Sequence, residues 1–189
     1  MDFAEELRDL FLMQQVYSTL LSVNNKLQAG SDRYFSKMSS RQYMAMMAVL
    51  HLQESEATIN NIARKLGTTK QNTKQLITAL VKKRYAVLKK SETDRRAANV
   101  EITPLGFSEL LTASEIGIMF LADVFNEFSG DELQVLWDLL KKLYRFDGKE
   151  QDGFETDVGE NIKMDKAARE LQGKALQAFA EKRKALKLR

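Results

Sequence analysis

The spacing of apolar residues predicts a largely helical chain. Over the first thirty positions, apolar side chains recur every three or four residues, at Leu10, Met13, Tyr17, Leu20 and Leu21. This pattern predicts a first helix over about residues 4–27, ended by the small and polar residues 29–32. A second helix is predicted to begin at Ser39, because Gln42 three residues later completes a capping box.

Two shorter amphipathic helices are predicted next. The first follows Thr58 and has apolar residues at helical spacing, at Ile59, Ile62, Ala63 and Leu66. The second begins after Thr68 and Thr69. The gap between the two helices is only Gly67 and Thr68, and a tight turn that contains glycine is typical of a helix-turn-helix.

The period then changes from helical to alternating. Residues 85–88 and 99–102 are predicted to be strands, and the segment between them is polar and charged. A β-hairpin with a charged tip directly after a helix-turn-helix is typical of a wing. Thr103 and Pro104 supply an N-cap and a proline at the first helical position, which predicts a long helix to about Phe128.

The C-terminal part contains two more predicted helices. Residues 129–132 form a capping box that opens one of them. A glycine-rich, acidic linker separates it from a final helix over about residues 161–187, which ends in a basic run. This last helix carries a weak heptad seam, at Met164, Ala168, Leu171, Ala175 and Ala178. Two alternatives stay open: the helix packs on a partner subunit with its basic end at DNA, or it is partly solvated.

We therefore predict a mainly α protein: a winged helix-turn-helix core with a small β-hairpin wing, flanked by helices that form a dimerisation region, plus a C-terminal helical extension. The predicted divisions are an N-terminal dimerisation helix (1–36), a winged helix-turn-helix DNA-binding domain (37–104), C-terminal dimerisation helices (105–147), an acidic linker (148–160) and a basic helical tail (161–189).

Composition excludes several classes of protein. The chain has 189 residues, a net charge of +3 and no cysteine, so it has no disulfide, no thiolate metal site and no cysteine redox sensor. The N-terminus is acidic where a secretory signal would be basic. The most apolar stretch, 105–125, carries Glu109, Glu115 and Asp123, so we expect no membrane span and a cytoplasmic location.

The charge pattern of the fourth helix indicates nucleic-acid binding. Between Thr68 and Arg84 there are five Lys or Arg residues and no acidic residue. Lysine can reach guanine, asparagine and glutamine can pair with adenine, and threonine can contact thymine or phosphate. The alternative for such a face alone is an ordinary solvated surface. The candidate recognition residues are Thr68, Thr69, Lys70, Gln71, Asn72, Lys74 and Gln75.

The predicted hairpin tip supplies a second candidate contact. Arg95 and Arg96 suit phosphates or a narrow minor groove, and Asp94 can orient one guanidinium. The alternative is an exposed ion pair, worth roughly 0–1 kcal/mol. Because these residues follow a tight turn and an acid-free helix, we favour the DNA-binding interpretation.

The segment from Ser39 to Gly106 resembles the MarR family of regulators (multiple antibiotic resistance type). The matching stretches are 38–43, 58–67, 73–80 and, most specifically, 93–106. The resemblance implies a homodimer, a recognition helix in the major groove, and Asp94 and Arg96 at the minor groove. It also implies that a small, often aromatic ligand binds between the dimerisation and DNA-binding parts, and many members are repressors that such a ligand releases.

One departure from the family pattern concerns the residue before the first strand. Arg84 stands where the family usually has glycine. If this position needs a positive φ, arginine costs about 1 kcal/mol relative to glycine. The alternative is that Arg84 adds a phosphate contact. The tail after Asp147 is not part of the family pattern, so the resemblance implies no role for it.

Other candidate sites are weaker. His51 is the only histidine, which argues against a zinc site and against a Ser/His/Asp enzyme, and no phosphate loop is present. Met44, Met46 and Met47 form either ordinary core or an adaptable ligand pocket. We therefore predict a non-enzymatic transcription regulator without a cofactor or metal.

Its predicted partners are double-stranded DNA with a pseudo-palindromic operator, a second copy of the chain, and a small-molecule effector, with repressor as the favoured role and no membrane partner. The alternative function is a winged-helix protein-interaction adaptor without specific DNA binding.

Overall fold

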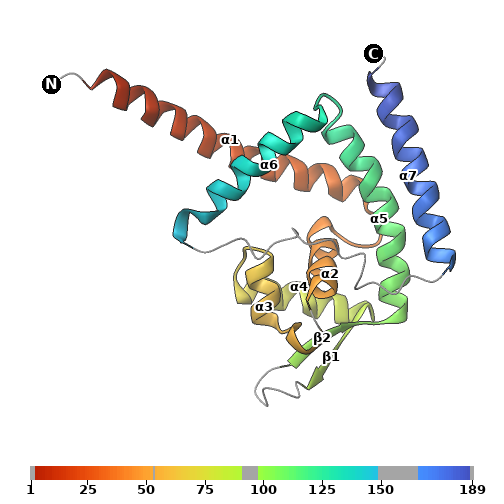
Figure 1. The fold of residues 1–189 in the computed structure, drawn as a ribbon. Helices are drawn as coiled ribbons and strands as arrows, with labels where there is room; N and C mark the ends of the chain where they lie inside the picture. The colour runs from red at the N-terminus through yellow and green to blue at the C-terminus, as the bar shows by residue number, and fades with distance from the viewer. Residues whose placement is uncertain (1–2, 53, 91–97, 149–165, 188–189) are drawn as a thin grey trace.

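The structure is a computed structural model that describes residues 3–52, 54–90, 98–148 and 166–187 (Figure 1). Helices form most of it, together with one two-stranded antiparallel hairpin, which confirms the predicted fold class. In chain order the elements are α1 (Ala4–Tyr34), α2 (Ser40–His51), α3 (Ile59–Lys65), α4 (Lys70–Lys82), β1 (Ala86–Lys90), β2 (Ala98–Ile102), α5 (Pro104–Val124), α6 (Gly130–Tyr144) and α7 (Lys166–Lys187). Single turns of 3-10 helix lie at Glu54–Glu56 and Arg145–Asp147.

The winged-helix core consists of α2, α3, α4 and the β1–β2 hairpin. Its largest fully buried side chains include Met46, Ile62, Ile77 and Leu80, one or two from each helix. The strands pair from Ala86 opposite Ile102 to Lys90 opposite Ala98. A further isolated bridge between Thr58 and Asn99 joins the start of α3 to the hairpin. The apolar stripes that predict these helices therefore meet in one core.

Helix α1 is longer than the sequence predicts. Residues 29–32 were expected to end it, whereas the helix continues to Tyr34. Gly30 and Ser31 are buried, and a Cβ at Gly30 would lie 3.2 Å from the ring of Phe120 on α5. The Ser31 hydroxyl donates to the carbonyl of Gln28 within the helix. Close packing on α5 therefore outweighs the local tendency of glycine and serine to end a helix.

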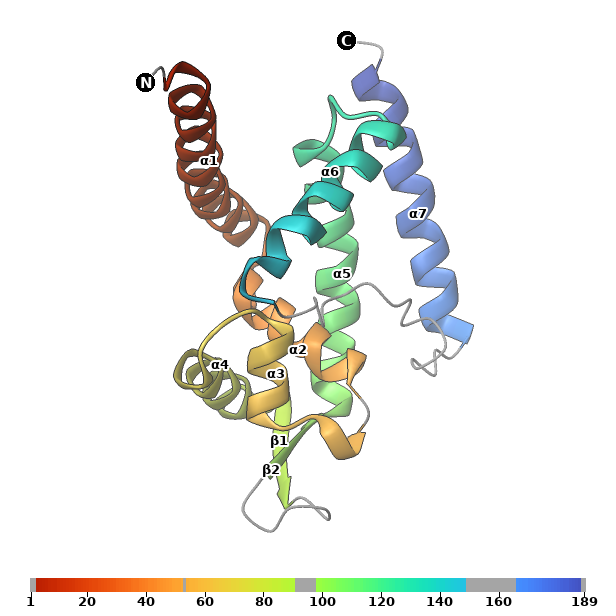
Figure 2. The ribbon, with the colours of Figure 1, turned by 60° about the vertical axis from the view of Figure 1, so that its left-hand side comes forward.

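Helix α5 runs from the wing to the corner with α6 and contacts α1, α2 and α7 (Figures 1 and 2). It ends at Val124, four residues before the predicted end. Among the described helices, it is the one long and apolar enough, by length and composition, to cross a membrane, a test that core helices also pass. In this structure Glu109 pairs with Lys37 and Asp123 pairs with Lys182, so both charges have partners.

The two arms of the molecule, α1 and α6, expose their apolar residues. Tyr17 is 68 % exposed, Leu7 is 63 % exposed and Leu139 on α6 is 59 % exposed. In Figure 2, α1 extends away from the winged-helix core, and α6 descends from the far end of α5. No residue of α6 is fully buried within the protomer. These arms are therefore only partly packed in a single copy of the chain.

Helix α7 packs along α5 of the same chain, and most of its described residues are exposed, in agreement with the partly solvated alternative. Of the predicted seam residues, Ala175 is buried but Ala178 is exposed, and Met164 lies outside the described residues. The buried line instead passes through Ala175, the half-buried Phe179 and Lys182. The C-terminus lies at the opposite end of the molecule from the hairpin in both views (Figures 1 and 2). Its basic end is therefore not beside the wing.

Candidate DNA-binding surface and adjoining cavity

The helix-turn-helix turn is built by a glycine and a threonine. Gly67 has a φ of +60°, a left-handed conformation in which a side chain would be strained. The amide of Thr68 then donates to the carbonyl of Ala63, which closes the end of α3. Thr69 caps α4 by accepting a hydrogen bond from the amide of Asn72 at 3.2 Å. These contacts fix the direction in which α4 leaves the turn.

Helix α4 has a buried side that faces the core. Thr73, Ile77 and Leu80 are almost completely buried. Because successive residues in a helix are rotated by about 100°, the residues at positions 71, 74, 78 and 82 lie roughly opposite this buried side or beside it. The core contacts therefore determine which polar residues of α4 face solvent.

The outward side of α4 carries part of the predicted recognition set. Lys70, Gln71 and Lys74 are all exposed. Thr78 and Lys82 share this side and are exposed too, although neither was among the predicted contacts. The signal that could have identified them is their spacing of four and eight residues from Lys74, continuing the same helical stripe.

The remaining predicted recognition residues have a second environment. Thr68, Asn72 and Gln75 line a cavity of about 850 Å³ that extends from the turn to α1 and α5. The Asn72 side-chain amide donates to the Thr68 hydroxyl at 3.4 Å. Thr69 is exposed, and its hydroxyl serves as the helix cap. The structure thus brings all seven residues to one end of α4, some on the outward side and some at the cavity. Gln75, exposed and four residues after Gln71, borders both.

The cavity is lined mainly by apolar and aromatic side chains. The rings of Phe35 and Tyr43 stack in its wall with centroids 5.4 Å apart. Burial raises the pKa of Tyr43, so its hydroxyl remains protonated at neutral pH. At the same cavity, the Arg41 guanidinium donates to the side-chain carbonyl of Gln28 through two nitrogens, at 2.9 and 2.6 Å. An aromatic wall with an oriented cation suits a flat ligand that carries negative charge.

The methionine cluster divides between core and cavity. Met46 is fully buried in the core, and Met47 packs against the core while partly exposed. Met44 lines the cavity. Met46 and Met47 therefore belong to ordinary core, and for Met44 an adaptable ligand pocket stays a prediction.

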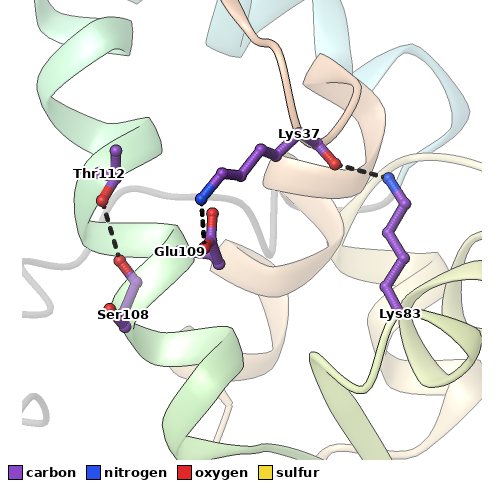
Figure 3. A network of polar contacts seen from close by, with 5 residues as sticks. All are labelled: Lys37, Lys83, Ser108, Glu109 and Thr112. Carbon is purple, nitrogen blue, oxygen red and sulfur yellow. Dashed lines mark hydrogen bonds and ion pairs between the residues drawn. The ribbon is translucent and has the colours of Figure 1, made fainter.

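A polar network holds the C-terminal end of α4 against the rest of the protomer (Figure 3). The Lys83 ammonium, just after α4, donates to the backbone carbonyl of Lys37 at 2.7 Å and to the side-chain carbonyl of Gln42 at 2.9 Å. Lys37 in turn pairs with Glu109 on α5 at 2.7 Å, which raises the pKa of the lysine. Lys83 is thus used inside the protomer and is not a free candidate for phosphate.

The surrounding segment is strongly basic. Residues 57–91 contain nine Lys or Arg residues and no Asp or Glu. Lys89 on β1 pairs with Glu101 on β2. The wing residues Asp94, Arg95 and Arg96 lie outside the described residues. Among the described residues, no group of three or more His, Asp or Glu side chains is arranged to hold a metal ion.

Residues 36–97, from the start of the α2 region into the wing, match the profile of the MarR family. This segment belongs to the MarR family. The comparison with curated proteins found no match.

Solved structures of MarR-type proteins share the fold. A MarR/EmrR family transcriptional regulator from Acinetobacter sp. ADP1 aligns with 22 % identity and a TM-score of 0.64, over 73 % of this chain and 99 % of its own. MepR from S. aureus, in complex with DNA, aligns with 19 % identity and a TM-score of 0.61, over 68 % and 96 %. BpsR from Bordetella bronchiseptica, whose DNA binding is regulated by 6-hydroxynicotinic acid, aligns with 15 % identity and a TM-score of 0.62, over 69 % and 98 %. At these identities the likeness shows the fold.

Two backbone features shape the MarR-type core where α4 meets the wing. Arg84 has a φ of +61° and is the one non-glycine residue in the described chain with a positive φ, as expected if the position requires that conformation. Its carbonyl accepts a hydrogen bond from the Thr103 hydroxyl at 2.6 Å. A Cβ at Gly106 would lie 2.0 Å from the Tyr85 carbonyl oxygen. The start of α5 is therefore packed directly on the backbone that follows the recognition helix.

Proposed function

We propose that this chain is a sequence-specific, double-stranded DNA-binding transcription regulator. The observation that carries the proposal is the outward side of α4, which exposes Lys70, Gln71 and Lys74 directly after a helix-turn-helix turn. No carboxylate lies within the surrounding segment 57–91 to repel phosphate. In this arrangement the first turns of the second helix enter the major groove.

We propose different roles for the residues on the two sides of α4. Gln71 and Lys74 read base edges, with glutamine directed to adenine and lysine to guanine. Lys70 neutralises a phosphate beside the helix N-terminus, where free amides also favour an anion. Thr68, Asn72 and Gln75 lie at the boundary between the DNA and the cavity.

The wing completes the proposed interface. Arg95 and Arg96 contact phosphates or a narrow minor groove, and Asp94 orients one of the two guanidinium groups. This part of the proposal rests on the sequence and on the match to the MarR family, which extends to residue 97.

We propose a homodimer as the active form. The large apolar residues in the N-terminal half of α1 are exposed in one protomer. Leu139 and Leu143 on α6 are exposed as well. A second copy that packs on both arms would bury these side chains at roughly 25 cal/mol per Å² of apolar area. Two recognition helices about 34 Å apart would then match a pseudo-palindromic operator.

Regulation by a small ligand is the third part of the proposal. The cavity is bounded on one side by α4 residues and on the other by α1 and α5. A ligand that binds there more tightly in one arrangement of α4 shifts the protein toward that arrangement. The structural neighbour BpsR is described as regulated by 6-hydroxynicotinic acid. We therefore propose a cytoplasmic, non-enzymatic repressor that a flat aromatic effector releases.

The experiment that tests DNA binding is selection of bound sequences from a random duplex pool by the full-length protein. We expect enrichment of two inverted half-sites whose centres are about one helical turn apart. Binding should weaken steeply with salt, with a slope in log K of about −0.9 for each phosphate neutralised. Failure to enrich any sequence, together with no retention on heparin at low salt, would contradict the proposal and favour the adaptor function.

A further inference from the structure

Helix α7 is attached to the far end of α5 by charged side chains. The Lys182 ammonium donates to the Asp123 carboxylate at 2.5 Å and to the Met119 carbonyl at 3.2 Å. The next residue, Arg183, donates to the carbonyls of Phe125 and Phe128, which follow the end of α5. Phe125 is the C-cap residue of α5, and its carbonyl also accepts from the Phe128 amide, so Arg183 ties the corner between α5 and α6 to α7.

Asp123 carries the attachment across α5 to α1. The same carboxylate oxygen that binds Lys182 also accepts a hydrogen bond from the Tyr34 hydroxyl at 2.6 Å. The bonds from Lys182 and Tyr34 lower the pKa of Asp123 and keep it charged at neutral pH. The Tyr34 ring also meets the Phe120 ring edge-on, with centroids 5.2 Å apart. Helices α7, α5 and α1 thus meet at one carboxylate.

The end of α1 that Tyr34 anchors is a wall of the cavity and a neighbour of α2. Gln28 and Ser31 of α1 line the cavity together with Phe120. Asp32 accepts a hydrogen bond from the backbone amide of Ser40, at the start of α2, at 2.7 Å. Displacement of this end of α1 would therefore move one cavity wall and the first helix of the winged-helix core.

We infer that α7 is a positioning element for the cavity: through Lys182 and Asp123 it holds the C-terminal end of α1 in place, although no described side chain of α7 lines the cavity itself. The inference rests on the proposed function only where it treats the cavity as the effector site. The positioning role concerns Lys182, Asp123 and Tyr34, and it is testable without DNA or ligand.

The test is amide hydrogen exchange of the full-length protein, read at residues 31–34 of α1. In Lys182→Met the apolar stem is kept and the bond to Asp123 is lost. We expect exchange in this segment to accelerate at least about five-fold, as for the loss of one charge-assisted hydrogen bond. Lys184→Met is the matched control, because Lys184 is exposed on the same helix and should leave α1 unchanged.

Tyr34→Phe tests whether the effect of Lys182 on α1 passes through the Asp123 carboxylate or reflects a general destabilisation of the protein. This variant should itself accelerate exchange at 31–34, and adding Lys182→Met should then change it less than about two-fold, because the shared acceptor no longer links the helices. Acceleration confined to α7 and α5, with α1 unchanged, would overturn the inference, and so would no change in any segment. Neither outcome bears on DNA binding, which the duplex selection tests separately.

Discussion

The winged-helix core and the helical arms contain the same kinds of apolar residues but place them differently. In the core, Met46, Ile62 and Leu80 are fully buried by other parts of one protomer. In the arms, large side chains such as Leu10 and Tyr17 are mostly exposed. The difference indicates that one chain is sufficient to complete the core, whereas the arms require a further surface, which we propose is a second copy.

The largest expected effect comes from placing negative charges on the exposed apolar residues of α1. Leu10→Asp combined with Tyr17→Asp places two carboxylates on one side of α1, and so four in a dimer, where burial would cost several kcal/mol. We expect the dimer dissociation constant, measured by sedimentation, to rise at least about 100-fold. Gln15→Asp combined with Ser22→Asp adds the same charge at the same spacing on a neighbouring polar side of α1, where both residues are exposed, and should leave assembly unchanged. A double variant that stays fully dimeric would exclude α1 from the interface.

The next effect distinguishes the core from the arms by how the stability of a variant depends on protein concentration. Leu80→Ala removes a fully buried core side chain and should lower the free energy of unfolding by about 3 kcal/mol. Leu139→Ala alters an arm residue and should cost little in dilute solution but more as the protein becomes dimeric. Urea unfolding at two protein concentrations measures both. If the loss in free energy of unfolding depends equally on protein concentration in both variants, the distinction between core and arms is wrong.

The smallest expected effect is a gain in stability at the strained residue. Arg84→Gly should raise the free energy of unfolding by about 1 kcal/mol, because glycine adopts a positive φ without cost from a side chain. Thermal unfolding measures this gain. The same variant tests the proposed alternative role of Arg84: if it contacts phosphate, the salt slope of DNA binding should fall by about 0.9. A variant less stable than the parent would contradict the assignment of strain.

Local sequence signals predicted the core well. The predicted caps Ser39, Thr103 and Ser129 each accept a backbone hydrogen bond at a helix start. The prediction of a β-hairpin after α4 is likewise confirmed. These features depend on residues close together in the chain, so periodicity and capping chemistry are sufficient to identify them.

Features set by distant contacts could not be predicted in the same way. The continuation of α1 past Gly30 depends on Phe120, ninety residues away. The exposed Ala178 and the attachment of Lys182 depend on how α7 lies on α5. Within the site, the composition of α4 indicated DNA binding, but which residues face outward and which face the cavity depends on the surrounding helices.

The most direct test of the central claim compares two sides of the recognition helix on a duplex selected by the parent protein. Gln71→Ala with Lys74→Ala should lower specific affinity at least about 100-fold, because each base contact is worth roughly 1–3 kcal/mol and both half-sites are affected. Asn72→Ala on the cavity side should reduce it much less, and circular dichroism should be unchanged in both variants. Full-strength binding of the selected duplex by the folded double variant would contradict the claim that this side of α4 reads DNA.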